Sequence, residues 1–108
     1  MIDWGRAQIQ LGKVTGYLLS ETHSEGRGKA KFFKAAGYDP ARPSELVEDL
    51  RMLAASHPVL ETERTPFGTK YKVRGTMTSP LGTTIRLMTV WIIESGRDAP
   101  RLVTAYPA

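Results

Sequence analysis

The hydrophobic pattern of this chain changes its period at Val59, and this change restricts the fold more than any other feature. Before Val59, apolar residues recur at helical spacing, as Leu46, Leu50 and Leu53 do in DPARPSELVEDLRMLAASHP. After Val59, apolar and polar residues alternate, and turns rich in Pro and Gly separate the alternating runs. Helices followed by strands predict an α+β domain, with two to three N-terminal helices packed on a C-terminal antiparallel sheet of about four strands.

Local signals place the helices. A short amphipathic helix is expected in LGKVTGYLLS, and a second in KAKFFKAAGY, where Gly37 fits a left-handed C-cap and Tyr38 folds back on the helix. The third helix is predicted to begin after an N-cap at Ser44. His57 lies at the end of this acidic helix and is interpreted as structural.

Four strands are expected in VLETER, TKYKVRGTM, TTIRLMTVWII and RLVTAY, joined near TPFG, SPLG and ESGRDAP. TTIRLMTVWII is apolar on both faces towards its end, which is typical of a central strand. No repeat or linker interrupts the pattern, so residues 1–108 are predicted to form a single domain.

Composition excludes several classes of protein. The chain has no cysteine, which removes disulfides and thiolate metal sites. Its two histidines lie far apart, and no HxxxH or paired-carboxylate spacing occurs, so we expect neither a metal nor another cofactor. The N-terminus MIDWGRAQIQ has no apolar signal segment, and no apolar run approaches the roughly 20 residues that cross a bilayer. A soluble protein without a membrane partner is the expectation.

The net charge of +4 is unevenly distributed. Residues 1–34 hold six Lys/Arg against three Asp/Glu, residues 35–63 hold two against six, and residues 64–108 hold seven against two. Basic segments on both sides of an acidic one favour a basic face that binds a polyanion such as RNA. Charge alone favours the simpler interpretation, an ordinary charged and solvated surface.

The last strand, RLVTAYPA, carries two hydroxyl side chains where a purely structural strand would continue with β-branched apolar residues. Strict alternation puts Leu102, Thr104 and Tyr106 on one face, and Val103 and Ala105 on the other, against the helices. Thr104 and Tyr106 would then present two hydroxyls on an open sheet face.

Other polar residues complete a candidate site. The neighbouring strand offers Arg86 on one face and Thr89 on the other, and the loop ETHSEGRG contains His23. Cations near His23 favour its neutral form, as a general base requires. These parts suit metal-free phosphodiester transfer, in which a base takes the 2′-hydroxyl proton while cations and hydroxyls stabilise the phosphorane. The alternative for each is structural: polar residues on a solvated sheet, and a loop histidine without a role.

KVTGYLLS…H…G…KAKFF…GY followed by LMTVWIIESGRDAPRLVTAYP resembles a bacterial family of uncharacterised small domains, found alone and at the C-termini of toxin-like proteins. The resemblance runs from about Lys13 to Pro107. The ending LVTAYP is also similar to the last strand of toxins in the barnase, EndoU and RelE-like ribonuclease superfamily. That superfamily places N-terminal helices before a four-stranded antiparallel sheet.

In the ribonuclease A-like toxins of this superfamily, a histidine of the helix region, a nearby basic residue and the Thr and Tyr of a terminal TAY form the site. The resemblance therefore implies catalytic roles for Thr104 and Tyr106, and for His23, which matches by region. The candidates for the basic residue are Lys29, Lys31 and Lys34. Lys29 is preferred because it lies in an HxxGxxKA-like stretch.

Two functions follow. The first is a metal-independent RNA endonuclease toxin, with tRNA among the candidate substrates, that acts in the cytoplasm after delivery in a secreted toxin and is neutralised by a cognate antitoxin or immunity protein. In it, Lys31, Arg86 and Thr89 would bind the substrate. The second is a non-catalytic RNA- or protein-binding module with a basic sheet face. Only the first requires His23, Thr104 and Tyr106 to converge.

Overall fold

The computed structural model describes residues 2–10, 12 and 27–108, except for the side chains of residues 27–29. Its elements are η1 (Trp4–Arg6), α2 (Arg27–Ala35), α3 (Pro43–Ser56), β1 (Val59–Thr65), β2 (Gly68–Thr78), β3 (Thr84–Glu94) and β4 (Arg101–Pro107). The strands form an antiparallel sheet in the order β1-β2-β3-β4, which confirms the α+β class. The helix expected in LGKVTGYLLS lies, apart from residue 12, outside the described residues.

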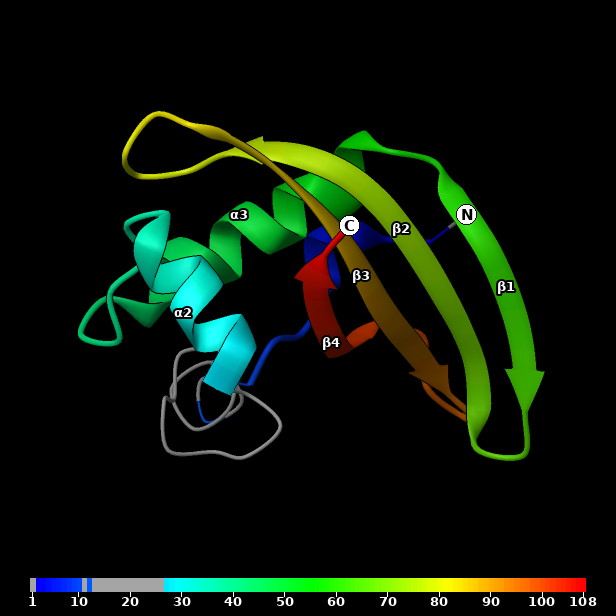
Figure 1. Cartoon of the computed structure of the whole chain (residues 1–108). Coiled ribbons are helices and arrows are strands. Elements are labelled where there is room, and N and C mark those ends of the chain that lie inside the picture. The colour runs from blue at the N-terminus through cyan, green and yellow to red at the C-terminus, as the bar shows by residue number, and fades with distance from the viewer. Residues whose placement is uncertain (1, 11, 13–26) are drawn as a thin grey trace.

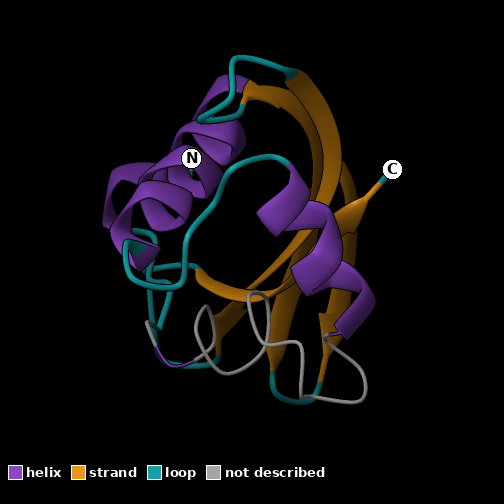
Figure 2. Cartoon of the chain, turned by 60° about the vertical axis from the view of Figure 1, so that its left-hand side comes forward, coloured by secondary structure: helices purple, strands orange, loops and turns teal. Residues whose placement is uncertain are grey.

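The core lies between the sheet and α3 (Figure 1). The sheet is curved, and α3 lies on its concave side (Figure 2). Leu46, Leu50 and Leu53, the predicted stripe of α3, are at most 2% exposed. Trp91 of β3 is fully buried and meets Trp4 of η1 edge to face, with ring centroids 5.3 Å apart.

The end of α2 confirms the predicted C-cap. Gly37 has a φ of 101°, a left-handed conformation that favours glycine. Its N–H donates to the carbonyl of Lys34 at 2.9 Å, and the N–H of Tyr38 donates to that of Phe33 at 3.0 Å. The rings of Phe33 and Tyr38 meet with centroids 6.1 Å apart, which completes a Schellman motif. The chain thereby turns from α2, which lies beside the β4 edge, towards α3 (Figure 1).

The start of α3 differs from the prediction. The helix begins at Pro43, so Ser44 lies inside the first turn and is not the N-cap. The N-cap is Arg42, which makes no side-chain capping hydrogen bond. Proline at the first helical position supplies a preset φ and has no N–H to satisfy, which explains a start two residues earlier than an N-cap at Ser44 would give.

His57 joins the end of α3 to β2, which agrees with its structural interpretation. Its Nδ1 donates to the carbonyl of Leu53 at 2.8 Å, and its Nε2 accepts the N–H of Thr76 at 3.3 Å. The ring lies against Gly75, where an added Cβ would be only 2.5 Å from the imidazole. A glycine at this position is what lets the helix end approach the strand.

β3 lies between β2 and β4, as its two-sided apolar pattern predicts. Its pairing with β4 contains a β-bulge: Thr104 lies opposite Val90, but Leu102 lies opposite Trp91, so Val103 is the extra residue. Leu102, 1% exposed, therefore packs in the core on the face of Trp91. The predicted placement of Leu102 with Thr104 is wrong, because strict alternation fails at a bulge.

Candidate functional site

The face of the sheet that points away from α3, here called the outer face, is crossed by rows of register partners. These rows are Lys72–Val90–Thr104, Arg74–Met88–Tyr106 and Thr76–Arg86. The rows between them contain the buried core residues Val73, Leu87 and Thr89, so the outer-face rows point the opposite way. Thr104 and Tyr106 thus share the outer face, as predicted.

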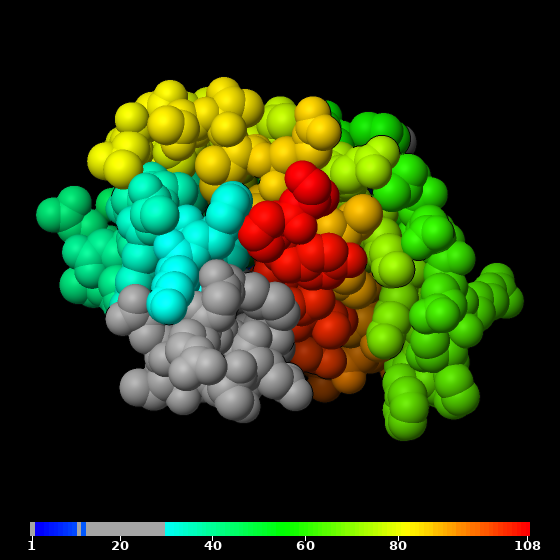
Figure 3. All heavy atoms as spheres, viewed as in Figure 1, coloured from blue at the N-terminus to red at the C-terminus, as the bar shows by residue number. Residues whose placement is uncertain are grey.

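One end of the outer face is open. Val90 and Ile92 are on this face yet only 8% and 6% exposed, whereas Arg74, Thr76 and Arg86 are exposed. The end of β4 reaches the surface here between α2 and the strands β2 and β3 (Figure 3). A ligand that approaches the outer face would therefore first meet the rows of Arg74 and Thr76.

The two arginines of this open end differ from the lysines further along β2. The Lys72 ammonium lies 3.3 Å from the Glu61 carboxylate, and Lys70 stands directly opposite Glu63. Within the described part of the chain, no ion pair involves Arg74 or Arg86.

Arg74 and Arg86 are diagonal neighbours on adjacent strands, because Arg74 faces Met88 and Arg86 lies two residues before Met88. Such diagonal positions are about 7–8 Å apart, within reach of long side chains. Two guanidinium groups at this spacing can bind one phosphate through several charge-assisted hydrogen bonds. Tyr106 faces Met88 from the other side, so Tyr106 lies in the row of Arg74.

Thr89 has a structural role and is unsuited to the substrate contact expected of it. It is fully buried on the core face. Its hydroxyl donates to the carbonyl of Val73 and accepts the indole N–H of Trp91, both at 2.8 Å. Thr89 fixes Trp91 within the core and cannot reach a ligand on the outer face, so this site prediction is corrected.

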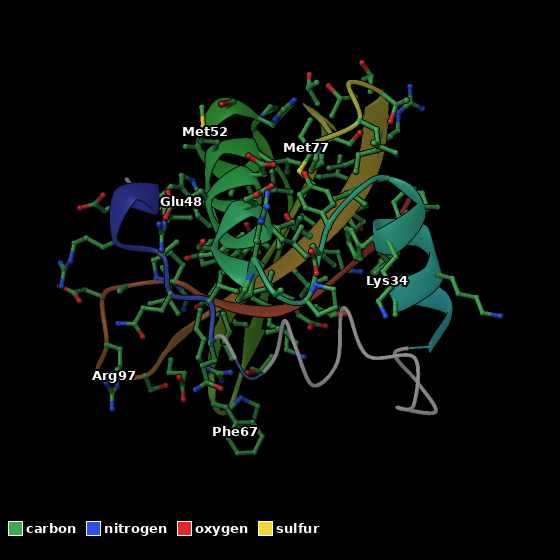
Figure 4. The ribbon with its side chains drawn as sticks, turned by 90° about the vertical axis from the view of Figure 1, so that its left-hand side faces the viewer. Lys34, Glu48, Met52, Phe67, Met77 and Arg97 are labelled. Carbon is green, nitrogen blue, oxygen red and sulfur yellow. The ribbon has the colours of Figure 1, made fainter. Side chains whose placement is uncertain are left out.

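Four candidate site residues belong to the N-terminal half. His23 lies outside the described residues, as does the side chain of Lys29, whose backbone lies in the first turn of α2. Lys31 is exposed on α2, which contacts β4. Lys34 lies further along α2, on the side of the molecule opposite to Glu48 of α3 (Figure 4). The convergence of His23 with Thr104 and Tyr106 stays a prediction.

Sequence reasoning missed Arg74. The alternation of Lys70, Lys72 and Arg74 in TKYKVRGTM was a usable signal that these residues share a face. The pairing that brings Arg74 into the row of Tyr106 depends on the register of three strands, which alternation alone does not define.

Two absences hold for the described residues. They contain no group of three His, Cys, Asp or Glu side chains placed to hold a metal ion. None of their helices combines the length and apolar character needed to span a membrane.

The chain belongs to the DUF6883 family, a domain of unknown function, whose family model matches residues 1–108. No match was found among curated proteins. Among solved structures, a chain of the "Contact-dependent growth inhibition toxin - immunity protein complex from Klebsiella pneumoniae 342" superposes with a TM-score of 0.73. The match covers 93% of this chain and 98% of that chain at 15% sequence identity, so it shows a shared fold.

Proposed function

We propose that this DUF6883 domain is a metal-independent endoribonuclease toxin that a cognate immunity protein neutralises. The observation that carries the proposal is the pair Arg74 and Arg86 on the outer face: both are exposed, neither has a carboxylate partner among the described residues, and Arg74 lies in the row of Tyr106. The shared fold with a chain of a toxin–immunity complex supports the toxin role and the kind of partner. Action in the cytoplasm of a target cell, after delivery in a larger secreted toxin, belongs to the same proposal.

The proposed reaction needs no cofactor. His23 takes the proton of a ribose 2′-hydroxyl, and the 2′-oxygen attacks the adjacent phosphorus. Arg74 and Arg86 stabilise the added charge on the phosphorane, while Thr104 and Tyr106 position it. The bond to the 5′-oxygen breaks as that oxygen receives a proton from Tyr106 or from protonated His23. The products are a 2′,3′-cyclic phosphate and a free 5′-hydroxyl.

The basic residues of α2 would complete the site. The helix contacts β4, and Lys31 is exposed on it. Lys29 precedes it by two residues and is the preferred basic partner of His23, with Lys31 binding a neighbouring phosphate. This arrangement would hold RNA between α2 and the open end of the outer face.

The test uses the purified full chain and total bacterial RNA, with EDTA present. The expected result is RNA fragments with 2′,3′-cyclic phosphate ends, which His23→Ala abolishes. An Arg74→Gln, Arg86→Gln variant should cleave at least about 100-fold more slowly, since each guanidinium stabilises transition-state charge. A matched control is Arg64→Gln, Arg97→Gln, which removes the same charge from two exposed arginines elsewhere.

Three outcomes would contradict the proposal: intact RNA with folded wild-type protein, full activity in His23→Ala, or equal losses in the two arginine variants. Intact RNA that is nevertheless bound at the outer face would favour the alternative, a non-catalytic RNA-binding module.

A further inference from the structure

The outer face has a hollow of about 350 Å³ between β1 and β2. Acidic and basic side chains alternate across it: its lining residues are Glu61, Thr62, Glu63, Lys70 and Lys72. We propose that Glu61 and Glu63 determine where RNA binds: they prevent it from lying along β2 and direct it across the row of Arg74 and Tyr106. This inference rests on the proposed function, because it takes RNA as the ligand of the outer face.

If β1 had no influence, the basic residues of β2 would favour a nucleic-acid backbone bound along the direction of the strand. Lys70, Lys72 and Arg74 occupy every second position of β2 and therefore share one face, where successive side chains lie about 7 Å apart. A regular basic row of this kind binds a single strand through its phosphates, whatever its sequence. RNA bound in that direction would extend away from Tyr106 and towards the β1–β2 turn.

Glutamates of β1 face two of these three basic residues and oppose their attraction for phosphate. Glu61 pairs with Lys72 at 3.3 Å, and both side chains are substantially exposed, at 63% and 44%. Glu63 stands directly across from Lys70. A phosphate that approached either lysine would meet a carboxylate at a similar distance, so its attraction and repulsion would largely cancel.

The cancellation of attraction by the glutamates extends only as far along β2 as β1 pairs with it. The pairing of β1 with β2 starts at Val59, which lies opposite Val73. Arg74 is one residue beyond that pair, so no residue of β1 faces it. The first basic position without a facing carboxylate is therefore the one in the row of Tyr106.

Cross-strand Glu–Lys pairs also stabilise sheets in the ordinary way, and a binding experiment separates the two roles. The probe is a fluorescent single-stranded 2′-O-methyl RNA, which the proposed chemistry cannot cleave because it lacks the free 2′-hydroxyl. Affinity is measured by anisotropy at several salt concentrations, for the full chain and for Glu61→Gln, Glu63→Gln. The matched control is Glu45→Gln, Glu48→Gln, which removes two carboxylates of α3 that form ion pairs with arginines.

The β1 variant should bind the probe about tenfold more tightly at low salt. Its plot of log K against log salt should steepen by about 0.7 for each lysine that becomes available to a phosphate. The α3 variant should change far less, since it alters net charge equally but lies on the concave side of the sheet, away from the outer face (Figure 2). Adding Lys70→Gln and Lys72→Gln to the β1 variant should return the affinity to the wild-type value.

Equal gains in the β1 and α3 variants would overturn the inference, because net charge would then explain both. No gain in a folded β1 variant, or no binding of the probe by any variant, would also overturn it. The test is independent of catalysis: a chain that binds RNA without cleaving it refutes the nuclease and leaves this inference standing. A chain that cleaves RNA but shows no gain in the β1 variant refutes only the inference.

Discussion

Replacing Gly75 by alanine tests how closely the end of α3 packs against β2, because the substitution adds a single carbon atom at their contact. The added Cβ would lie 2.5 Å from both Cγ and Nδ1 of His57, closer than non-bonded atoms tolerate. The ring has little freedom to move away, because Leu53 and Thr76 hold its two nitrogens by hydrogen bonds of 2.8 and 3.3 Å. Either the ring moves and loses a hydrogen bond, or the strand shifts away from the helix.

The size of the effect follows from three contributions. Overpacking of a filled site costs about 1–3 kcal/mol. Loss of one of the hydrogen bonds of His57 costs about 1 kcal/mol more. Alanine opposes these with a gain of up to about 1 kcal/mol, because it lowers the entropy of the unfolded chain. The steric cost exceeds that gain, so Gly75→Ala should lower the free energy of unfolding by about 2 kcal/mol.

Urea unfolding, followed by tryptophan fluorescence, measures this change, and a double-mutant cycle identifies its cause. His57→Ala removes the ring, so Gly75→Ala in that background should cost less than about 0.5 kcal/mol. If Gly75→Ala is equally costly with and without the ring, the contact with His57 is not the reason for the glycine. A negligible cost in the wild-type background would refute the close approach itself.

Three further substitutions test other parts of the fold. Thr89→Val should cost about 2 kcal/mol in urea unfolding, because it leaves the Trp91 indole N–H without its acceptor in the core and removes the hydrogen bond to the Val73 carbonyl, while RNA binding should not change. Gly37→Ala should cost about 1–2 kcal/mol, since its φ is 101° and a Cβ would lie 2.8 Å from Leu81; a neutral result would argue against the left-handed cap. Burial and the hydrogen bond to Asp49 raise the pKa of Tyr38, so above about pH 10 the unfolded chain loses this proton first and stability falls with rising pH. Tyr38→Phe should flatten that alkaline slope of stability, and an unchanged slope would assign it to other groups.

An interaction of the outer face with RNA would depend more on β2 and β3 than on β4. The hydroxyls of Thr104 and Tyr106 drew attention to β4, but the charge that can attract RNA there comes from β2 and β3, through Arg74 and Arg86. Charge on the outer face is also organised by β1, whose two glutamates face lysines and leave the arginines unopposed. The net charge of the chain does not show which charged residues face each other.

The sequence by itself determined the order and type of the elements, the buried stripe of α3 and the cap after α2. Each of these depends on residues close together in the chain. Helical and strand periods, a glycine in a left-handed conformation and Pro–Gly turns are local properties, so alternation and spacing predict them well. The sequence also predicted the central position of β3, because a strand with apolar residues on both faces is typical of the covered centre of a sheet.

Tertiary structure decided which residues meet across the sheet. The bulge at Val103 placed Leu102 in the core, and the register of β2, β3 and β4 placed Arg74 in the row of Tyr106. Thr89 became a buried hydrogen-bond partner of Trp91. Register is set by the pairing of segments far apart in sequence and by how their faces pack on α3, and a shift of one residue exchanges the two faces of a strand. The sequence could therefore single out Arg86, Thr104 and Tyr106, but only the paired strands show that Arg74 shares their face and that Thr89 does not.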